Sequence, residues 1–182
     1  ATFYSISNCQ EGLSRVTLGN FLIKRVVYEI QEELPHIKNF GTLSPIPGFV
    51  EWFSYLEEIK IKNILGNLTN QNVSFLKSKD LKIGDHRFIE NKDAIIKLIA
   101  HYIVNEKNQK GLPVNAVSRF HLGNGAIVED IVVNANISEA GFKRSFGVMV
   151  NYLYELRNIE KNHEDYMNNN QVIVSNKIRK YL

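Results

Sequence analysis

The 182-residue chain contains one cysteine, Cys9, which allows no internal disulfide and fits a reducing compartment. Its longest apolar stretches, such as Phe21–Ile23 and Val148–Val150, are far shorter than the roughly 20 residues of a membrane-spanning helix. The 22 Lys and Arg nearly balance the 19 Asp and Glu, and the two signs are interspersed. We therefore expect no membrane partner and no nucleic-acid partner, because a nucleic-acid surface needs clustered cations. The first residues form neither a basic nor an apolar leader, which favours a cytoplasmic protein.

Motifs of several enzyme classes are also missing. No His and Cys pair has the spacing of metal ligands, and no His-Glu-x-x-His, Gly-x-Ser-x-Gly or Walker sequence occurs. The sequence therefore indicates that no metal is bound. With 44% hydrophobic and 23% charged residues, the composition is that of an ordinary globular domain. We found no repeat and no linker, so we expect one domain over residues 1–182.

The apolar pattern predicts an α/β (α+β) fold with a mixed sheet flanked by helices. Residues 60–90 are rich in Asn, Lys and Asp and are predicted to be a surface excursion. Residues 117–120 are too short to assign, and residues 148–156 fit either a helix or a strand. Strands are expected over residues 3–7, 36–43 and, at the centre of the sheet, 126–133; helices are expected over 20–34, 49–59, 93–105, 159–167 and 172–181.

A polar loop with small residues, Gln10–Gly19, leads directly into the first predicted helix. Such a loop presents free backbone N–H groups and the positive end of the helix dipole, an arrangement that suits a phosphate. Many loops of this kind bind nothing, so both interpretations stay open at this point.

Two further residues stand out by their surroundings. Ser44 follows a predicted strand and precedes the stiff bend Pro45–Gly48, where it either meets a ligand or starts the turn and caps the next helix. His121 lies in a glycine-containing stretch ahead of a predicted strand, where it is either a structural imidazole or a reactive one. The remaining histidines are expected to be surface or packing residues: His36, His86, His101 and His163.

Five segments, in this order, resemble the malonyl-CoA decarboxylase family. They span nearly the whole chain, and the Leu-Ser-Pro-Ile-Pro-Gly-Phe string in the third is the most specific. The segments are Phe3–Ser7, Leu18–Lys24, Thr42–Phe49, Phe120–Ala126 and Met149–Tyr154.

The resemblance implies a fold similar to the acetyl-CoA-dependent N-acetyltransferases (GNAT-like), and it assigns roles to six residues. Ser44 and His121 match the family's catalytic serine and histidine, and Ser5 and Tyr154 match residues at its active site. The loop with Thr17 and Gly19 takes the place that holds the coenzyme A pyrophosphate. These six positions are the candidate site: Ser5, Thr17, Gly19, Ser44, His121 and Tyr154.

The implied activity is that of a carboxy-lyase of fatty acid metabolism, converting malonyl-CoA to acetyl-CoA and CO2. The thioester carbonyl stabilises the enolate left by CO2, so we expect no cofactor, coenzyme A being part of the substrate. The protein must orient the carboxylate, stabilise the enolate and deliver a proton. We expect His121 to be the proton donor, since imidazoles titrate near neutral pH, and Ser44 to orient the substrate.

The chain departs from the family pattern in two ways. The helical domain and core strands that precede Phe3 in the family are absent, so we expect an N-terminally truncated catalytic domain whose open strand edge favours a homo-oligomer. Asn136 replaces an acidic residue, which is expected to alter packing or electrostatics near His121. The alternative functions are a coenzyme A-dependent acyltransferase and an inactive coenzyme A-binding fragment of a split decarboxylase.

Overall fold

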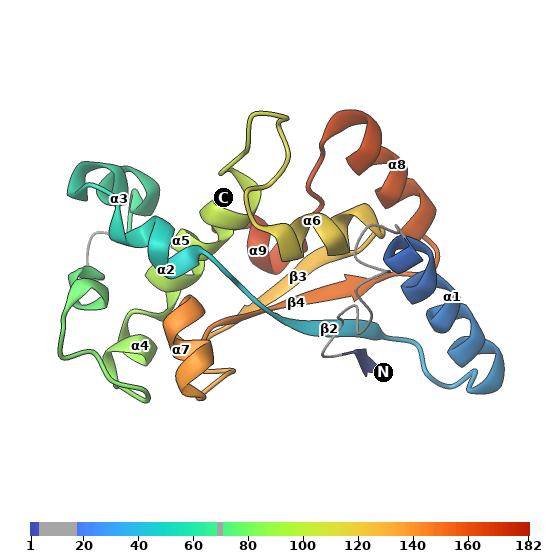
Figure 1. Cartoon of the computed structure of the whole chain (residues 1–182), viewed down its shortest axis with the longest axis horizontal. Helices are drawn as coiled ribbons and strands as arrows, with labels where there is room; N and C mark the ends of the chain where they lie inside the picture. The colour runs from blue at the N-terminus through green and yellow to red at the C-terminus, as the bar shows by residue number, and fades with distance from the viewer. Residues whose placement is uncertain (4–17, 69–70) are drawn as a thin grey trace.

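The computed structural model describes residues 1–3, 18–68 and 71–182, and Figure 1 shows their arrangement. A four-stranded mixed sheet forms the centre, in the order β1-β2-β4-β3. The strands are β1 (Thr2–Phe3), β2 (Phe40–Pro45), β3 (Ile127–Val132) and β4 (Met149–Tyr154). β1 runs parallel to β2, whereas β4 is antiparallel to both β2 and β3. The predicted mixed sheet with helices is thus confirmed.

Helices make up most of the remainder of the described chain. Figure 1 shows α2 to α5 gathered beyond one end of the sheet, α1 and α8 near the other end, and α6 lying across the sheet. None of the described helices is long and apolar enough to cross a membrane. The helices are α1 (Leu18–Glu33), α2 (Phe49–Ser54), α3 (Glu58–Leu65), the 3₁₀ helix η2 (Ser74–Lys77), α4 (Arg87–Glu90), α5 (Lys92–Val104), α6 (Ala116–Gly123), α7 (Glu139–Ser145), α8 (Ile159–Asn169) and α9 (Asn176–Arg179).

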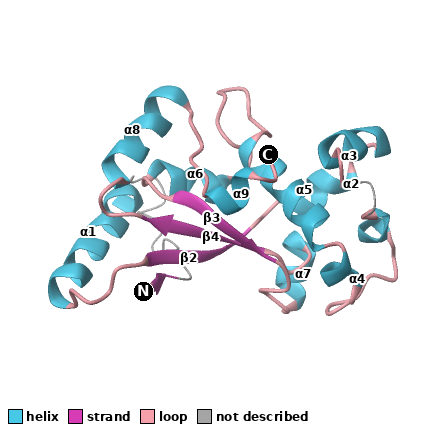
Figure 2. Cartoon of the chain, turned by 180° about the vertical axis from the view of Figure 1, so that it is seen from behind, coloured by secondary structure: helices cyan, strands magenta, loops and turns pink. Residues whose placement is uncertain are grey.

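The sheet order corrects one expectation. The stretch 126–133 was expected at the centre because it is rich in β-branched residues, but β3 is the outer strand of the described sheet. β4 occupies the inner position because it pairs with β2 on one side and β3 on the other. On its far side β3 forms an isolated bridge between Val128 and Val174. Figure 2 shows this edge, where β3 lies beside β4.

Residues 60–90 were predicted to be a surface excursion, and this prediction is wrong. The segment forms α3, η2 and α4, and each of them contributes side chains to the core. Phe88 is fully buried and packs edge-on against Phe75 with ring centroids 5.4 Å apart. The polar residues of this region therefore alternate with core residues over short helical turns. The predicted helix 49–59 likewise divides into α2 and α3, with Tyr55 ending the first.

Other boundaries shifted as well. The strand predicted over 36–43 is β2, which begins at Phe40 and ends at Pro45, so that Ser44 lies within the strand. The ambiguous segment 148–156 is a strand, β4. The closing helix predicted over 172–181 is only α9. Of the strand expected over Phe3–Ser7, the described part is β1, and the remainder lies outside the described residues.

Candidate active site

Ser44 is the penultimate residue of β2 and lies opposite Val150 of β4. Successive side chains of a strand point to opposite faces, so Ser44 and Thr42 share the face that α6 covers. The Ser44 side chain is 5% exposed. Its hydroxyl donates a hydrogen bond of 3.0 Å to Thr42 Oγ1, and its Oγ lies 2.9 Å from His121 Nε2. The two predicted catalytic side chains therefore meet directly, 77 positions apart in the sequence.

Two hydrogen bonds to a single backbone carbonyl oxygen hold the bend after Ser44 in place. The Pro47 carbonyl oxygen accepts hydrogen bonds from the Tyr102 hydroxyl at 3.1 Å and from Asn115 Nδ2 at 2.9 Å. Gly48 follows with φ of 81°, a left-handed conformation that side chains rarely adopt. A Cβ at this position would lie 2.8 Å from the Tyr102 hydroxyl. The glycine is therefore needed both for backbone conformation and for space.

His121 is located on α6, not in the glycine-rich turn from which it was singled out. Asn115 directly precedes the helix, and its side chain accepts a hydrogen bond from the Ser118 backbone N–H at 2.8 Å and so caps the first turn. The helix ends just before Asn124, and Gly125 then adopts a φ of 79°. The helix points His121 at the sheet, where its side chain is only 2% exposed.

Tyr154 is the third predicted site residue that the structure brings here. It lies on β4 opposite Phe40, is 1% exposed, and places its hydroxyl 2.8 Å from His121 Nδ1. Because the Ser44 hydroxyl donates to Thr42, its Oγ is free to accept a hydrogen bond from Nε2–H of His121. Nδ1 is then unprotonated and accepts from the Tyr154 hydroxyl. This assignment from the hydrogen-bond network gives a continuous chain of donors that runs from Tyr154 through His121 and Ser44 to Thr42.

Burial sets the charge of this cluster. It lowers the pKa of His121 from 6.5 to about 4, because a charged imidazole loses its hydration here. The expectation that this imidazole titrates near neutral pH is therefore wrong for the free protein, in which His121 is neutral at pH 7. Burial also raises the pKa of the Tyr154 hydroxyl, which keeps that donor protonated. The site is thus uncharged until an anion enters it.

The other candidate residues are placed differently. Ser5 and Thr17 lie outside the described residues. Gly19 was expected to end the phosphate loop, but α1 begins at Leu18, so Gly19 is in the first turn of this helix. Asn136 makes its side-chain hydrogen bonds at the start of α7, where Oδ1 accepts from the Ser138 hydroxyl at 2.7 Å. Whether it alters the electrostatics near His121 stays a prediction.

Sequence reasoning missed three side chains of this site. Thr42 accepts from Ser44, Tyr152 stacks on His121 with ring centroids 4.4 Å apart, and Ser118 lies 2.8 Å from the Tyr152 hydroxyl. A signal for two of them was available. Thr42 and Tyr152 stand two residues from Ser44 and Tyr154, the spacing that places side chains on one face of a strand.

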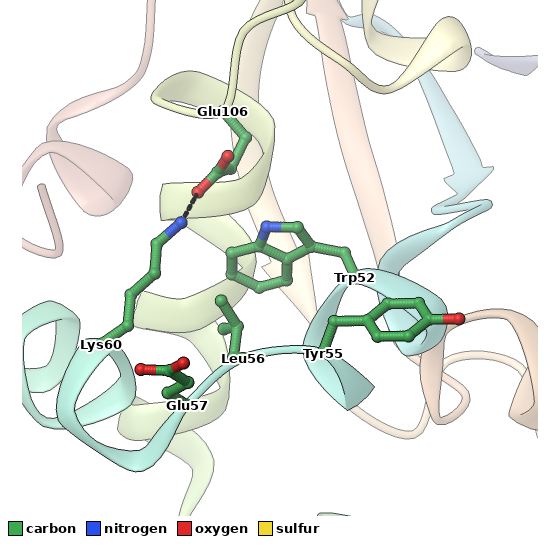
Figure 3. Close-up of a pocket in the computed structure, with 6 residues that line it drawn as sticks. All are labelled: Trp52, Tyr55, Leu56, Glu57, Lys60 and Glu106. Atoms are coloured by element: carbon green, nitrogen blue, oxygen red, sulfur yellow. Dashed lines mark hydrogen bonds and ion pairs between the residues drawn. The ribbon is translucent and has the colours of Figure 1, made fainter.

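Two cavities of the described structure lie away from this pair. One, of about 400 Å³, is bordered by α2, α3 and the segment after α5. Figure 3 shows Lys60 pointing toward Glu106, and the Lys60 Nζ lies 2.9 Å from Glu106 Oε1. The other, of about 540 Å³, lies between α3 and η2. Neither is lined by Ser44 or His121. Within residues 1–3, 18–68 and 71–182, no three His, Cys, Asp or Glu side chains gather as metal ligands would.

Comparison with known proteins identifies the family. The malonyl-CoA decarboxylase C-terminal domain family matches residues 1–182, the whole chain. The chain belongs to this family. Similar curated proteins include the mitochondrial malonyl-CoA decarboxylases of Rattus norvegicus, 35% identical over 201 residues, and of Anser anser anser, 34% identical over 200 residues. These matches cover 98% and 100% of this chain but 40% of each relative.

Solved structures give the same result for the fold. A malonyl-CoA decarboxylase from Cupriavidus metallidurans is 37% identical with a TM-score of 0.83, covering 100% of this chain and 48% of that chain. The malonyl-CoA decarboxylase from Rhodopseudomonas palustris is 38% identical with a TM-score of 0.78, and the match covers 99% of this chain and 41% of that chain. The chain therefore has the fold of the corresponding part of those enzymes, spanning less than half their length. The GNAT-like description, the truncated-domain boundaries and the cytoplasmic location stay predictions, and the curated relatives named here are mitochondrial.

Proposed function

We propose that this chain decarboxylates malonyl-CoA to acetyl-CoA and CO2, with His121 as proton donor and Ser44 orienting the substrate. One observation carries the proposal: in a chain of this family, Ser44 and His121 lie 2.9 Å apart and are buried together. A hydroxyl and an imidazole in contact can position an anion and move a proton without a metal.

The reaction begins with breakage of the bond between the carboxylate carbon and the methylene carbon of malonyl-CoA. The electron pair of that bond moves into the thioester as an enolate, and CO2 leaves. As the substrate binds, the Ser44 hydroxyl exchanges its hydrogen bond to Thr42 for one donated to the malonyl group, and so holds the breaking bond in the orientation the thioester requires. A single proton must then reach the methylene carbon to complete the acetyl group.

His121 supplies this proton although it is neutral in the free protein. The malonyl carboxylate is an anion, and an anion beside a buried imidazole favours the charged ring and raises its pKa. The imidazole therefore takes up a proton from solvent at Nδ1 as the substrate binds, and the Tyr154 hydroxyl turns to accept from Nδ1–H. The Nε2–H proton passes to carbon once CO2 has left, while the hydrogen bond between Nδ1 and Tyr154 keeps the ring oriented. Loss of the Nδ1 proton and return of a proton to Nε2 then restore the starting form of the ring.

The test supplies malonyl-CoA alone to the 182-residue chain and follows acetyl-CoA and CO2. We expect both products, in equal amounts, with no acceptor present. His121→Gln should reduce their formation by two to four orders of magnitude, the usual contribution of a general acid. Lys60→Met, at the outer cavity, is the control and should leave the rate unchanged.

Two results would contradict the proposal in distinguishable ways. Acyl transfer that requires an added amine or thiol, without free acetyl-CoA, would identify an acyltransferase. Binding of coenzyme A without turnover of malonyl-CoA would identify a non-catalytic binding fragment.

A further inference from the structure

Three side chains, those of Asn115, Ser118 and Tyr152, connect the bend after Ser44 to one face of the His121 imidazole. Asn115, Ser118 and His121 follow one another at three-residue spacing, so they lie along one face of α6. Tyr152 lies below them on β4, opposite Thr42. Apart from His121 itself, none of these residues was assigned a role by the sequence.

The first link joins Asn115 to the bend. Its Nδ2 donates to the Pro47 carbonyl oxygen at 2.9 Å, three residues after Ser44. Its Oδ1 accepts both the backbone N–H of Ser118 at 2.8 Å and the Ser118 hydroxyl at 3.1 Å. One amide therefore ties the position of the Ser44 bend to the first turn of the helix that carries His121.

The second link joins Ser118 to Tyr152. The single proton of the Ser118 hydroxyl is donated to Asn115, so Ser118 Oγ accepts from the Tyr152 hydroxyl, 2.8 Å away. This bond fixes the end of the Tyr152 ring. The ring itself stacks on the His121 imidazole with centroids 4.4 Å apart and planes inclined by 24°.

We propose that Asn115, Ser118 and Tyr152 form a positioning chain, which holds the His121 imidazole in the plane where Nε2 faces Ser44 and Nδ1 faces Tyr154. Rotation of the ring would break both of these hydrogen bonds, and the Tyr152 ring opposes such rotation by lying flat against the imidazole. None of the three residues touches the reacting atoms. Their effect on rate rests on the proposed function, whereas their effect on the imidazole does not.

The decisive variant is Tyr152→Phe, which keeps the stacked ring and removes the hydroxyl that fixes it. The matched control is Tyr166→Phe, because the buried Tyr166 hydroxyl has no hydrogen-bond partner among the described residues. Nitrogen NMR of ¹⁵N-histidine-labelled protein reads the state of the ring directly, with His121→Gln assigning the signals. In the parent chain we expect one His121 species, protonated at Nε2 and not at Nδ1.

In Tyr152→Phe we expect signals from a mixture of the two tautomers, whereas Tyr166→Phe should retain the single species. In the malonyl-CoA assay, Tyr152→Phe should lower kcat by ten- to a hundredfold, on the order of the loss from a misplaced catalytic group, with KM nearly unchanged. Ser118→Ala removes the same bond from the other side, so the Tyr152→Phe, Ser118→Ala double variant should be no slower than the slower single variant.

Two outcomes would overturn the proposal, and a third would overturn only the proposed function. An unchanged His121 spectrum in folded Tyr152→Phe and Ser118→Ala proteins would show that the chain does not position the ring. Equal effects of Tyr152→Phe and Tyr166→Phe would show a general packing role. If the parent chain releases no CO2 but the tautomer changes as expected, the proposed function fails while the positioning chain stands.

Discussion

The burial of His121 makes the stability of this protein depend on pH, and the substitution His121→Gln isolates this contribution. The imidazole has its pKa lowered from 6.5 to about 4 in the folded state, because burial disfavours its charged form. Between these two values the unfolded chain binds a proton that the folded chain does not. Stability is therefore fully present above pH 6.5 and is lost as the pH falls toward 4.

The size of the effect follows from the shift. One pKa unit corresponds to about 1.4 kcal/mol, so the complete loss below pH 4 is about 3 kcal/mol. Linkage gives a loss of about 2 kcal/mol between pH 7.5 and pH 5, where the carboxylates still contribute little. The side chain is only 2% exposed, so solvent screening reduces this value little.

The assay is urea denaturation of the parent chain and of His121→Gln at pH 7.5, 6 and 5. Subtracting the two curves removes the contribution of other groups, including His101, whose pKa burial also lowers. The parent should lose about 2 kcal/mol relative to His121→Gln over this range. A difference that stays constant with pH, or that grows in favour of the parent at pH 5, would refute the assignment of a neutral buried imidazole.

Three further substitutions test the frame of the site. Gly125→Ala should destabilise the protein by more than about 2 kcal/mol in urea denaturation, because φ is positive there and a Cβ would overlap the Ile159 carbonyl oxygen; an unchanged midpoint would contradict this. Gly48→Ala should lower the rate of CO2 release by a larger fraction than it lowers the urea midpoint, because it displaces the bend beside Ser44; equal fractional losses would contradict this. Lys60→Met removes the ion pair with Glu106 and should cost less than about 1 kcal/mol in the same denaturation assay, since Lys60 is half exposed; a larger loss would show a structural role.

The sequence was sufficient to locate α5 and to single out three of the side chains that meet in the structure: Ser44, His121 and Tyr154. The regular spacing of Ile95, Ile96 and Ile99 predicted a helix that the structure places within one residue, because all three side chains face the core. Their surroundings singled out Ser44 and His121 with two interpretations each, and the family resemblance then favoured the catalytic one. The sequence alone could not show that they touch, because their contact joins β2 to α6, two elements far apart in the sequence.

Helix α6 was missed because it has only 8 residues, too few for a local pattern to assign. It is stabilised by the Asn115 cap and by contacts of its polar side chains with β4, which local patterns do not report. The order of the strands was also beyond local reasoning. The alternation of apolar and polar residues shows which side chains share a face of a strand. It does not show which strands lie next to each other, because long-range packing decides that. The β-rich segment 126–133 was therefore wrongly expected at the centre of the sheet. The lowered pKa of His121 depends on the same burial and was equally hidden.

In the proposed reaction the serine of β2 and the histidine of α6 act as one functional unit. The most direct test is the rate of CO2 release from malonyl-CoA by Ser44→Ala, His121→Gln and the double variant, each measured against the parent chain. We expect large losses in both single variants and a double variant no slower than the slower of the two, because either change already breaks the unit. Losses that multiply in the double variant, or a single variant with parental turnover, would contradict it.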